Sequence, residues 1–111
     1  YDVLAQVIVL DQFSRNIYRD TPSMFAADDH ALSLACHSVA RGDHHKIAHP
    51  CMRTFLFMPY MHSEDAQVQD AGLKLLQETA DQEPVDSPVS PFLRYSIDYM
   101  KKHQVIVKRF G

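Results

Sequence analysis

Residues 55–65 read FLFMPYMHSED, and our interpretation of the chain starts from this stretch. Positions 55–61 are apolar, with a break at Pro59. Burying one large apolar side chain is worth roughly 1.5–3 kcal/mol, so this run is predicted to lie in the core of the protein. The tetrapeptide HSED at 62–65 follows directly, so the same run would carry an imidazole and two carboxylates to the edge of that core.

The composition indicates one small globular domain. The chain has 111 residues, of which 46% are hydrophobic and 23% charged. Its net charge of −3 argues against nucleic acid or an anionic membrane as a partner, because both bind through a surplus of Lys and Arg. No apolar run reaches the ~18 residues that a membrane span needs, and no signal peptide is recognisable, so a cytoplasmic location is expected. Cys36 and Cys51 are expected to be small buried side chains without a disulfide.

Hydrophobic periodicity predicts an all-α fold of about five helices and gives no strand pattern. Residues 3–13 are apolar nearly all round, which is typical of a helix that is buried on most sides. A strand is the alternative here, and the good helix formers Leu, Ala and Gln favour the helix. Further helices are predicted over 29–41, 51–58, 64–81 and from Ser90-Pro91 to the end of the chain, with a linker at 82–90.

Single residues mark the expected ends of these helices. Asp28 is expected to cap the second helix and Gly42 to end it. Pro59 is expected to disturb the third helix, because proline has no backbone N–H to donate. Ser63 is expected to begin the fourth helix, and the two acids that follow it would face the positive end of the helix dipole.

The last two predicted helices carry apolar stripes at helical spacing. The stripe within 64–81 comprises Val68, Ala71, Gly72, Leu75, Leu76 and Ala80. The stripe of the last helix comprises Phe92, Tyr95, Tyr99, His103, Ile106 and Phe110, so His103 is expected to be largely buried. Because the links between successive helices are short, we expect antiparallel αα-hairpins stacked side by side.

Catalytic candidates are His62, Glu64 and His103. A histidine near a carboxylate at a helix start can act as acid and base or bind a metal. The alternative is structural, with both histidines satisfied at the edge of the core and the acids serving only the helix end. The chain lacks the H-E-x-x-H and C-x-x-C spacings, and His44, His45 and His49 flank a predicted loop. We therefore predict no metal site, and no cofactor, because three glycines leave little room for a phosphate-binding loop.

A second polar row, Asp11, Arg15, Asn16 and Arg19, begins inside the first predicted helix. An arginine in a buried helix must be paired, because an isolated buried charge is very costly. One interpretation is an Asp11–Arg15 ion pair that also bonds to a neighbouring helix end. The other is a pocket for a carboxylate or phosphate, which suits the planar guanidinium. A combined arrangement would have Arg15 or Arg19 meet Glu64 or Asp65 across the core.

Three segments, LDQFSRNIYR at 10–19, MPYMHSED at 58–65 and HQVIVKRFG at 103–111, resemble a bacterial family, domain of unknown function family 924. The resemblance extends over essentially the whole chain and implies a fold similar to the tetratricopeptide-like helical repeats. The family pattern D-Q-F-P-R-N has a proline where this chain has Ser14, and its H-R-D stands where this chain has HQV at 103–105. The family continues beyond both ends, so this chain is expected to be a fragment. The resemblance implies an architecture and no activity.

The function expected from these features is a small helical binding or interaction module with a polar groove. Its partner is expected to be a small ligand or a peptide, and self-association stays open. The predicted ligand-binding residues are Asp11, Arg15, Asn16, Arg19 and Asp65. The alternative is a hydrolase-like enzyme in which His62 and His103 act as acid and base and Glu64 orients one of them. An enzyme requires these side chains to converge around a space for substrate, whereas a binding module tolerates them along a groove.

Overall fold

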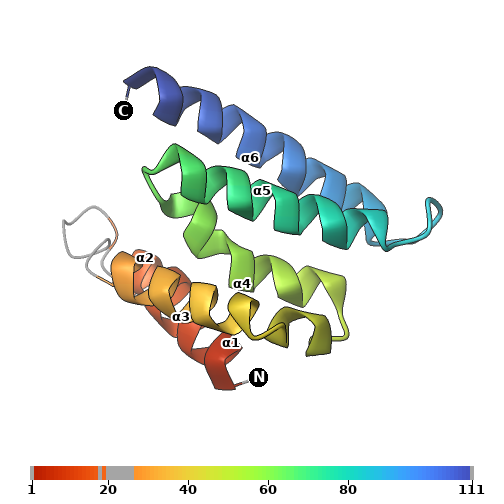
Figure 1. The fold of residues 1–111 in the computed structure, drawn as a ribbon, viewed down its shortest axis with the longest axis horizontal. Coiled ribbons are helices and arrows are strands. Elements are labelled where there is room, and N and C mark those ends of the chain that lie inside the picture. Colours follow the sequence, from red (N-terminus) through yellow and green to blue (C-terminus); the bar gives the residue numbers. More distant parts are fainter. Residues whose placement is uncertain (1, 18, 20–26, 111) are drawn as a thin grey trace.

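The computed structural model describes residues 2–17, 19 and 27–110, and every regular element in them is a helix (Figure 1). Helix α1 (Asp2–Ile8) continues through a π-helical segment, η1 (Val9–Phe13), into α2 (Ser14–Ile17). The elements that follow are α3 (Asp28–Ala40), the 3-10 turn η3 (Asp43–Lys46), α4 (Pro50–His62), α5 (Ala66–Asp81) and α6 (Ser90–Phe110). The prediction of an all-α fold is confirmed. None of the helices described is long and apolar enough to cross a membrane.

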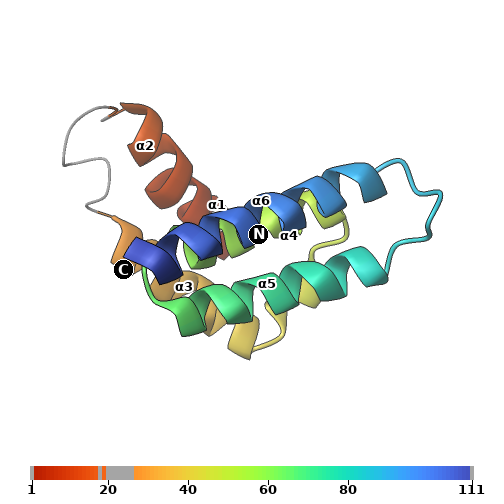
Figure 2. The same ribbon diagram turned by 90° about the horizontal axis from the view of Figure 1, so that it is seen from above.

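Helix α4 lies at the centre of the packing. It contacts α5 and α6 on one side and α1 and α3 on the other. Helices α4 and α6 run in the same direction and α5 runs against both (Figure 1). Seen from above, α5 lies on one side of the molecule and α1 and α2 lie on the opposite side (Figure 2). The core therefore forms around the sequence 55–61, as its apolar run predicts.

The predicted break at Pro59 is wrong, because α4 continues through Pro59 to His62. A proline inside a helix costs about 3 kcal/mol. Leu56 and Phe57 are each 1% exposed, and each such side chain contributes roughly 1.5–3 kcal/mol when buried. Their burial matches or exceeds the cost of the proline, so the helix runs one turn further and His62 becomes its last residue.

The loop between α4 and α5 uses a different cap from the one predicted. Helix α5 begins at Ala66, and its N-cap is Asp65, whose Oδ1 accepts hydrogen bonds from the backbone N–H groups of Gln67 at 2.8 Å and Val68 at 3.4 Å. Ser63 accepts instead from the backbone N–H of Asp65 at 3.1 Å. The expected helix start at Ser63 is therefore corrected by two residues, and Asp65 is committed to the helix end.

Helices α4 and α5 approach closely at Gly72. A Cβ atom built on Gly72 would overlap the Cβ of Tyr60 and lie 3.1 Å from its Cγ. The Tyr60 side chain is 5% exposed, and burial raises the pKa of its phenol. Within the predicted α5 stripe, Gly72, Leu76 and Ala80 are buried, whereas Ala71 is exposed. The glycine is thus a packing residue at the centre of the fold.

The predicted stripe of α6 faces the wrong way. Phe92, Tyr95, Tyr99 and Ile106 are between 45% and 68% exposed, and His103 is half-buried. The side chain of Phe110 lies outside the described residues. Helix α6 has a second line of residues at helical spacing, and this line packs against the core: Leu93, Ile97, Met100 and Gln104. Aliphatic side chains have no polar group to satisfy, whereas a tyrosine facing outward keeps its hydroxyl in water.

The first helix is also less buried than predicted. Leu4 and Val7 are 4% and 0% exposed, whereas Val9, Phe13 and Ile17 are 51%, 52% and 72% exposed. Because α1 lies at the edge of the helix stack, it packs on α3 and α4 with one face only. The two cysteines are also less buried than predicted, because Cys36 is exposed and Cys51 is half-buried. Both are free thiols.

Helix α3 starts without the predicted cap. Its N-cap position is Ala27, which offers no side-chain hydrogen bond, and Asp28 is the first helical residue. The expected end is confirmed, because the chain leaves α3 through Gly42 with φ of 77°, a left-handed conformation that favours glycine. The side chain of Asp28 is therefore available for a different role.

Candidate functional site

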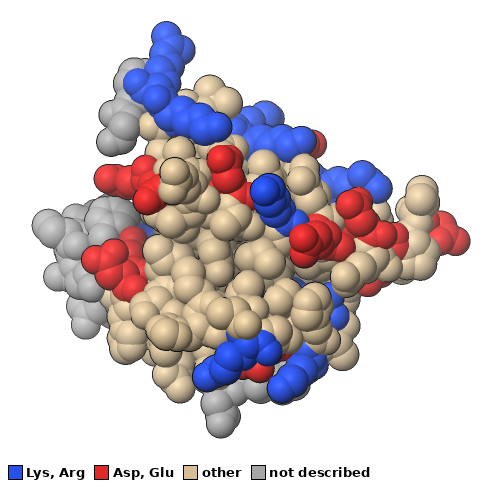
Figure 3. All heavy atoms as spheres, viewed as in Figure 1, with Lys and Arg blue, Asp and Glu red and all other residues tan. Residues whose placement is uncertain are grey.

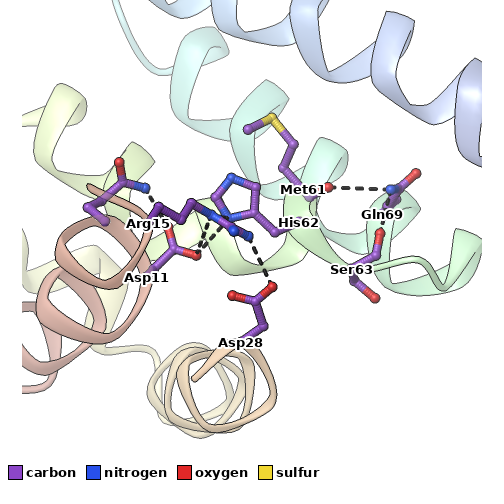
Figure 4. A network of polar contacts seen from close by, with 8 residues as sticks. Asp11, Arg15, Asp28, Met61, His62, Ser63 and Gln69 are labelled. Atoms are coloured by element: carbon purple, nitrogen blue, oxygen red, sulfur yellow. Dashed lines mark hydrogen bonds and ion pairs between the residues drawn. The ribbon is translucent and has the colours of Figure 1, made fainter. Parts of the chain in front are cut away.

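The π-helical segment η1 places Asp11 inside the protein. A π turn carries one more residue than an α turn, which redirects the side chains around it, and such turns occur often at functional sites. Asp11 is 1% exposed, and its Oδ2 accepts a hydrogen bond from the side-chain amide of Gln12. A buried carboxylate has to be paired, and Figure 4 shows the side chains that surround it.

The principal partner of Asp11 is His62, which α4 presents at its last residue. The Nδ1 atom of His62 lies 2.6 Å from Oδ1 of Asp11. An ionised carboxylate can only accept, so the proton in this contact resides on Nδ1. The other ring nitrogen, Nε2, points away from Asp11 (Figure 4). In the neutral ring Nε2 is then the acceptor, which is the arrangement of a histidine oriented by a carboxylate.

Arg15 connects the first helix to both α3 and α4. Its Nη2 donates to Oδ2 of Asp28 at 3.0 Å, and its Nε lies 4.0 Å from Oδ1 of Asp11. The same Nε is 3.2 Å from Nδ1 of His62. Nδ1 cannot donate to Asp11 and accept from Arg15 at once, and the shorter contact to the buried charge decides the tautomer. Arg15 therefore acts mainly as an ionic link between two carboxylates.

Next to this network is an open pocket of about 630 Å³. It lies between α2, α3, the end of α4 and the last third of α6. The charged and titratable side chains that line it are Arg15, Asp28, Asp29, His62, Glu64 and His103. Among its other lining residues are Leu32 from α3 and Val107 from α6, which give the pocket an apolar wall.

The structure brings together part of the predicted site. His62, Glu64, His103 and Arg15 line the pocket, and Asp11 supports it from behind. The carboxylate at hydrogen-bond distance from His62 is thus Asp11, whereas the sequence suggested Glu64, which is exposed at the pocket rim.

Three of the predicted ligand-binding residues do not line the pocket, namely Asn16, Arg19 and Asp65. Asn16 and Arg19 are exposed, and Arg19 donates to Oδ1 of Asn16 at 3.4 Å. Asp65 caps α5. The expected contact of an arginine with Glu64 or Asp65 is replaced by the Arg15–Asp28 ion pair.

Sequence reasoning missed the contribution of α3. Asp28 and Asp29 line the pocket from the first turn of this helix, and Asp28 was expected to cap the helix. An aspartate that precedes an apolar helical pattern can either cap the helix or form an ion pair, and the sequence favours neither role. Only the position of Arg15 in space distinguishes the two roles. Within the described ranges, no group of three or more His, Cys, Asp or Glu side chains is arranged to hold a metal ion.

Comparisons with known proteins place the chain in a family. The model of a family described as bacterial protein of unknown function (DUF924) matches residues 1–111. Among solved structures, the chain is similar to the protein of unknown function ATU0120 from Agrobacterium tumefaciens, with 29% sequence identity and a TM-score of 0.78. The similarity covers 98% of this chain and 54% of that chain, so this chain spans about half the length of its solved relative. No curated protein is significantly similar to it.

The three segments that carry the family resemblance meet at the pocket. Asp11 and Arg15 come from the segment 10–19, His62 and Glu64 from 58–65, and His103 from 103–111. These segments are far apart in the sequence, and the packing of α4 between α1 and α6 brings them together.

Proposed function

We propose that this chain, which belongs to the bacterial DUF924 family of unknown function, is a ligand-binding module. Its ligand, a small molecule or a short peptide, would occupy the 630 Å³ pocket beside His62. Stacked helical hairpins of the tetratricopeptide-like kind use such hollows to bind peptides and small ligands. We further propose that the module acts in the cytoplasm.

The observation that carries this proposal is the way His62 is held. Its Nδ1 is fixed by Asp11 at 2.6 Å, so its Nε2 faces away from the buried carboxylate with its direction already set. Asp11 is itself 1% exposed and cannot turn toward water. Binding groups held by a supporting layer of hydrogen bonds lose little conformational freedom when a ligand arrives, and this improves affinity.

A thermal-shift screen of small polar molecules and short peptides against this chain tests the proposal. A compound present at about 100 times its Kd should stabilise the folded protein by about 2.7 kcal/mol and raise its melting temperature. His62→Ala should abolish the shift, because it removes the oriented ring from the pocket. His37→Ala, at an exposed position of α3, should retain it. A hit that stabilises wild type and His62→Ala equally would place binding outside this pocket and contradict the proposal.

A second candidate, a hydrolase-like enzyme, is favoured by the same short Asp11–His62 contact. In this case His62 Nε2 would take a proton from a water molecule bound in the pocket, and Asp11 would stabilise the resulting imidazolium. His103, on the facing helix, would be the second acid–base group.

An assay with ester, amide and phosphate-ester substrates tests the enzyme candidate. Asp11→Asn should lower kcat by about 10²–10⁴, the usual contribution of general acid–base catalysis, because it removes the charge that stabilises the imidazolium. Hydrolysis that is equally fast with Asp11→Asn would exclude this mechanism. Ligand binding without turnover would leave the binding module as the function.

A further inference from the structure

A second pocket of about 230 Å³ lies between α4 and α6, and its wall is almost entirely apolar. Its larger side chains are Phe57, Met58 and Met61 from α4, Leu76 from α5, and Phe92, Tyr95, Tyr99 and Met100 from α6. A cavity of about 150 Å³ is enough to bind benzene, so this pocket has room for an aromatic ring or a short alkyl chain. Tyr95 and Tyr99 are 68% and 52% exposed, so the pocket opens to solvent along α6.

The apolar pocket adjoins the polar pocket along the same pair of helices. Helices α4 and α6 run in the same direction (Figure 1). Met58 and Tyr99 line the apolar pocket, and His62 and His103, each four residues further along, line the polar pocket. Four residues advance a helix by about 6 Å, so the two pockets follow each other along the same pair of helices. The two pockets together are called the groove, with an apolar and a polar section.

The charge of the polar section selects a cationic group. Its lining contains the carboxylates of Asp28, Asp29 and Glu64 and one permanent cation, Arg15. Arg15 is bonded to Asp28 and lies 4.0 Å from the buried Asp11. Among the residues that line the polar section, acidic groups therefore outnumber permanent cations, and this favours a positively charged ligand group in direct contact with them. This sign is opposite to the carboxylate or phosphate that the arginines alone suggested.

We propose that the groove binds a primary amine attached to an apolar group, and this rests on the proposed function as a ligand-binding module. The ammonium lies among the carboxylates of the polar section, and an aromatic ring or alkyl chain of similar size fills the apolar section. A linker of about four methylene groups spans one helical turn.

A second copy of the chain fits the groove less well. Helix α6, which forms one wall, carries Arg94, Lys101, Lys102, Lys108 and Arg109 against the single acid Asp98. Figure 3 shows Lys and Arg side chains gathered along the upper edge of the molecule, where α6 lies. Two α6 helices packed against each other would bring these positive charges together, which is unfavourable.

An NMR titration with three probes tests the amine proposal on the wild-type chain. The probes are 4-phenylbutylamine, butylamine, which lacks the ring, and 4-phenylbutanoate, which reverses the charge. We expect 4-phenylbutylamine to bind about tenfold or more tightly than butylamine, because burying a phenyl ring accounts for a factor of that size. We also expect it to bind more tightly than 4-phenylbutanoate, because the carboxylates of the polar section repel an anionic ligand. Its binding should shift the resonances of both His62 and Tyr99.

Two variants separate the two sections of the groove. Ser96→Met fills the apolar section and should reduce the affinity for 4-phenylbutylamine to that for butylamine, with butylamine unaffected. Ser33→Met, at an exposed position on α3, is the matched control and should change neither. Glu64→Gln should weaken both amines.

The outcomes distinguish this inference from the proposed function. If butylamine and 4-phenylbutylamine bind equally well beside His62, or if 4-phenylbutanoate binds best, the amine proposal is overturned while the polar pocket remains a binding site. If gel filtration shows a dimer that 4-phenylbutylamine does not dissociate and Ser96→Met does, a second copy is the occupant and the proposal is overturned. If no probe shifts His62, the amine proposal is overturned, and the screen with His62→Ala decides the proposed function separately.

Discussion

Replacing Gly72 by leucine is expected to destabilise the protein by about 3 kcal/mol or more, a large share of the ~5–15 kcal/mol that stabilise a typical domain. Any side chain at this position would place its Cβ against the Cβ of Tyr60. That atom is attached directly to the backbone of α4 and cannot rotate away. Helices α4 and α5 would therefore have to separate, and the packing between them would be lost.

Chemical denaturation of Gly72→Leu and its neighbour Ala71→Leu measures this effect. Ala71 is exposed on the same turn of α5, so Ala71→Leu should change the free energy of unfolding by less than about 0.5 kcal/mol. Gly72→Ala should fall between the two, because alanine gains about 1 kcal/mol of helix propensity while its methyl group still meets Tyr60. Equal stability of the two leucine variants would show that the helices do not approach at this point.

Replacing Asp11 by alanine is the second substitution with a large expected effect, a loss of about 3–5 kcal/mol in the free energy of unfolding. Asp11 is 1% exposed and lies 2.6 Å from His62. Its removal leaves a cavity in the core and takes the carboxylate from His62. Arg15 loses the nearby charge of Asp11 and retains its pair with Asp28.

The same denaturation experiment supplies the control for Asp11. Asp86 is an exposed acid in the linker between α5 and α6, and Asp86→Ala should change the unfolding free energy by less than about 0.5 kcal/mol. Asp11→Asn keeps the shape of the side chain and should lose less than Asp11→Ala. If Asp11→Ala is no more harmful than Asp86→Ala, Asp11 is not a buried partner of His62.

Local patterns in the sequence were sufficient for the all-α fold and for the central part of the core. The run at 55–61 is buried because few other placements of so many adjacent apolar side chains are stable in water. The helix over 64–81 was recognisable from its apolar spacing, and Gly42 from its position after α3. Each of these features depends on residues within one or two turns.

Features that depend on distant residues were not predictable. Helix α6 has two lines of apolar residues, and the spacing alone does not say which one packs on α5. Pro59 remains within α4 because surrounding helices bury its neighbours, and Asp28 turns to Arg15 because α2 lies beside α3. The π turn that buries Asp11 has no spacing signature in the sequence. Regular α-helical spacing therefore places Asn16 and Arg19 in one row with Asp11 and Arg15, whereas both are exposed in the structure.

A double-mutant cycle between Asp11 and His62 tests most directly whether the first helix and α4 build one site. The free energy of unfolding is measured for wild type, Asp11→Ala, His62→Ala and the double variant. We predict that the double variant loses about 1–3 kcal/mol less than the two single losses added together, because either single substitution already breaks the shared contact. Losses that add to within about 0.5 kcal/mol would mean that the two side chains act independently, and would contradict the oriented histidine on which the proposed function depends.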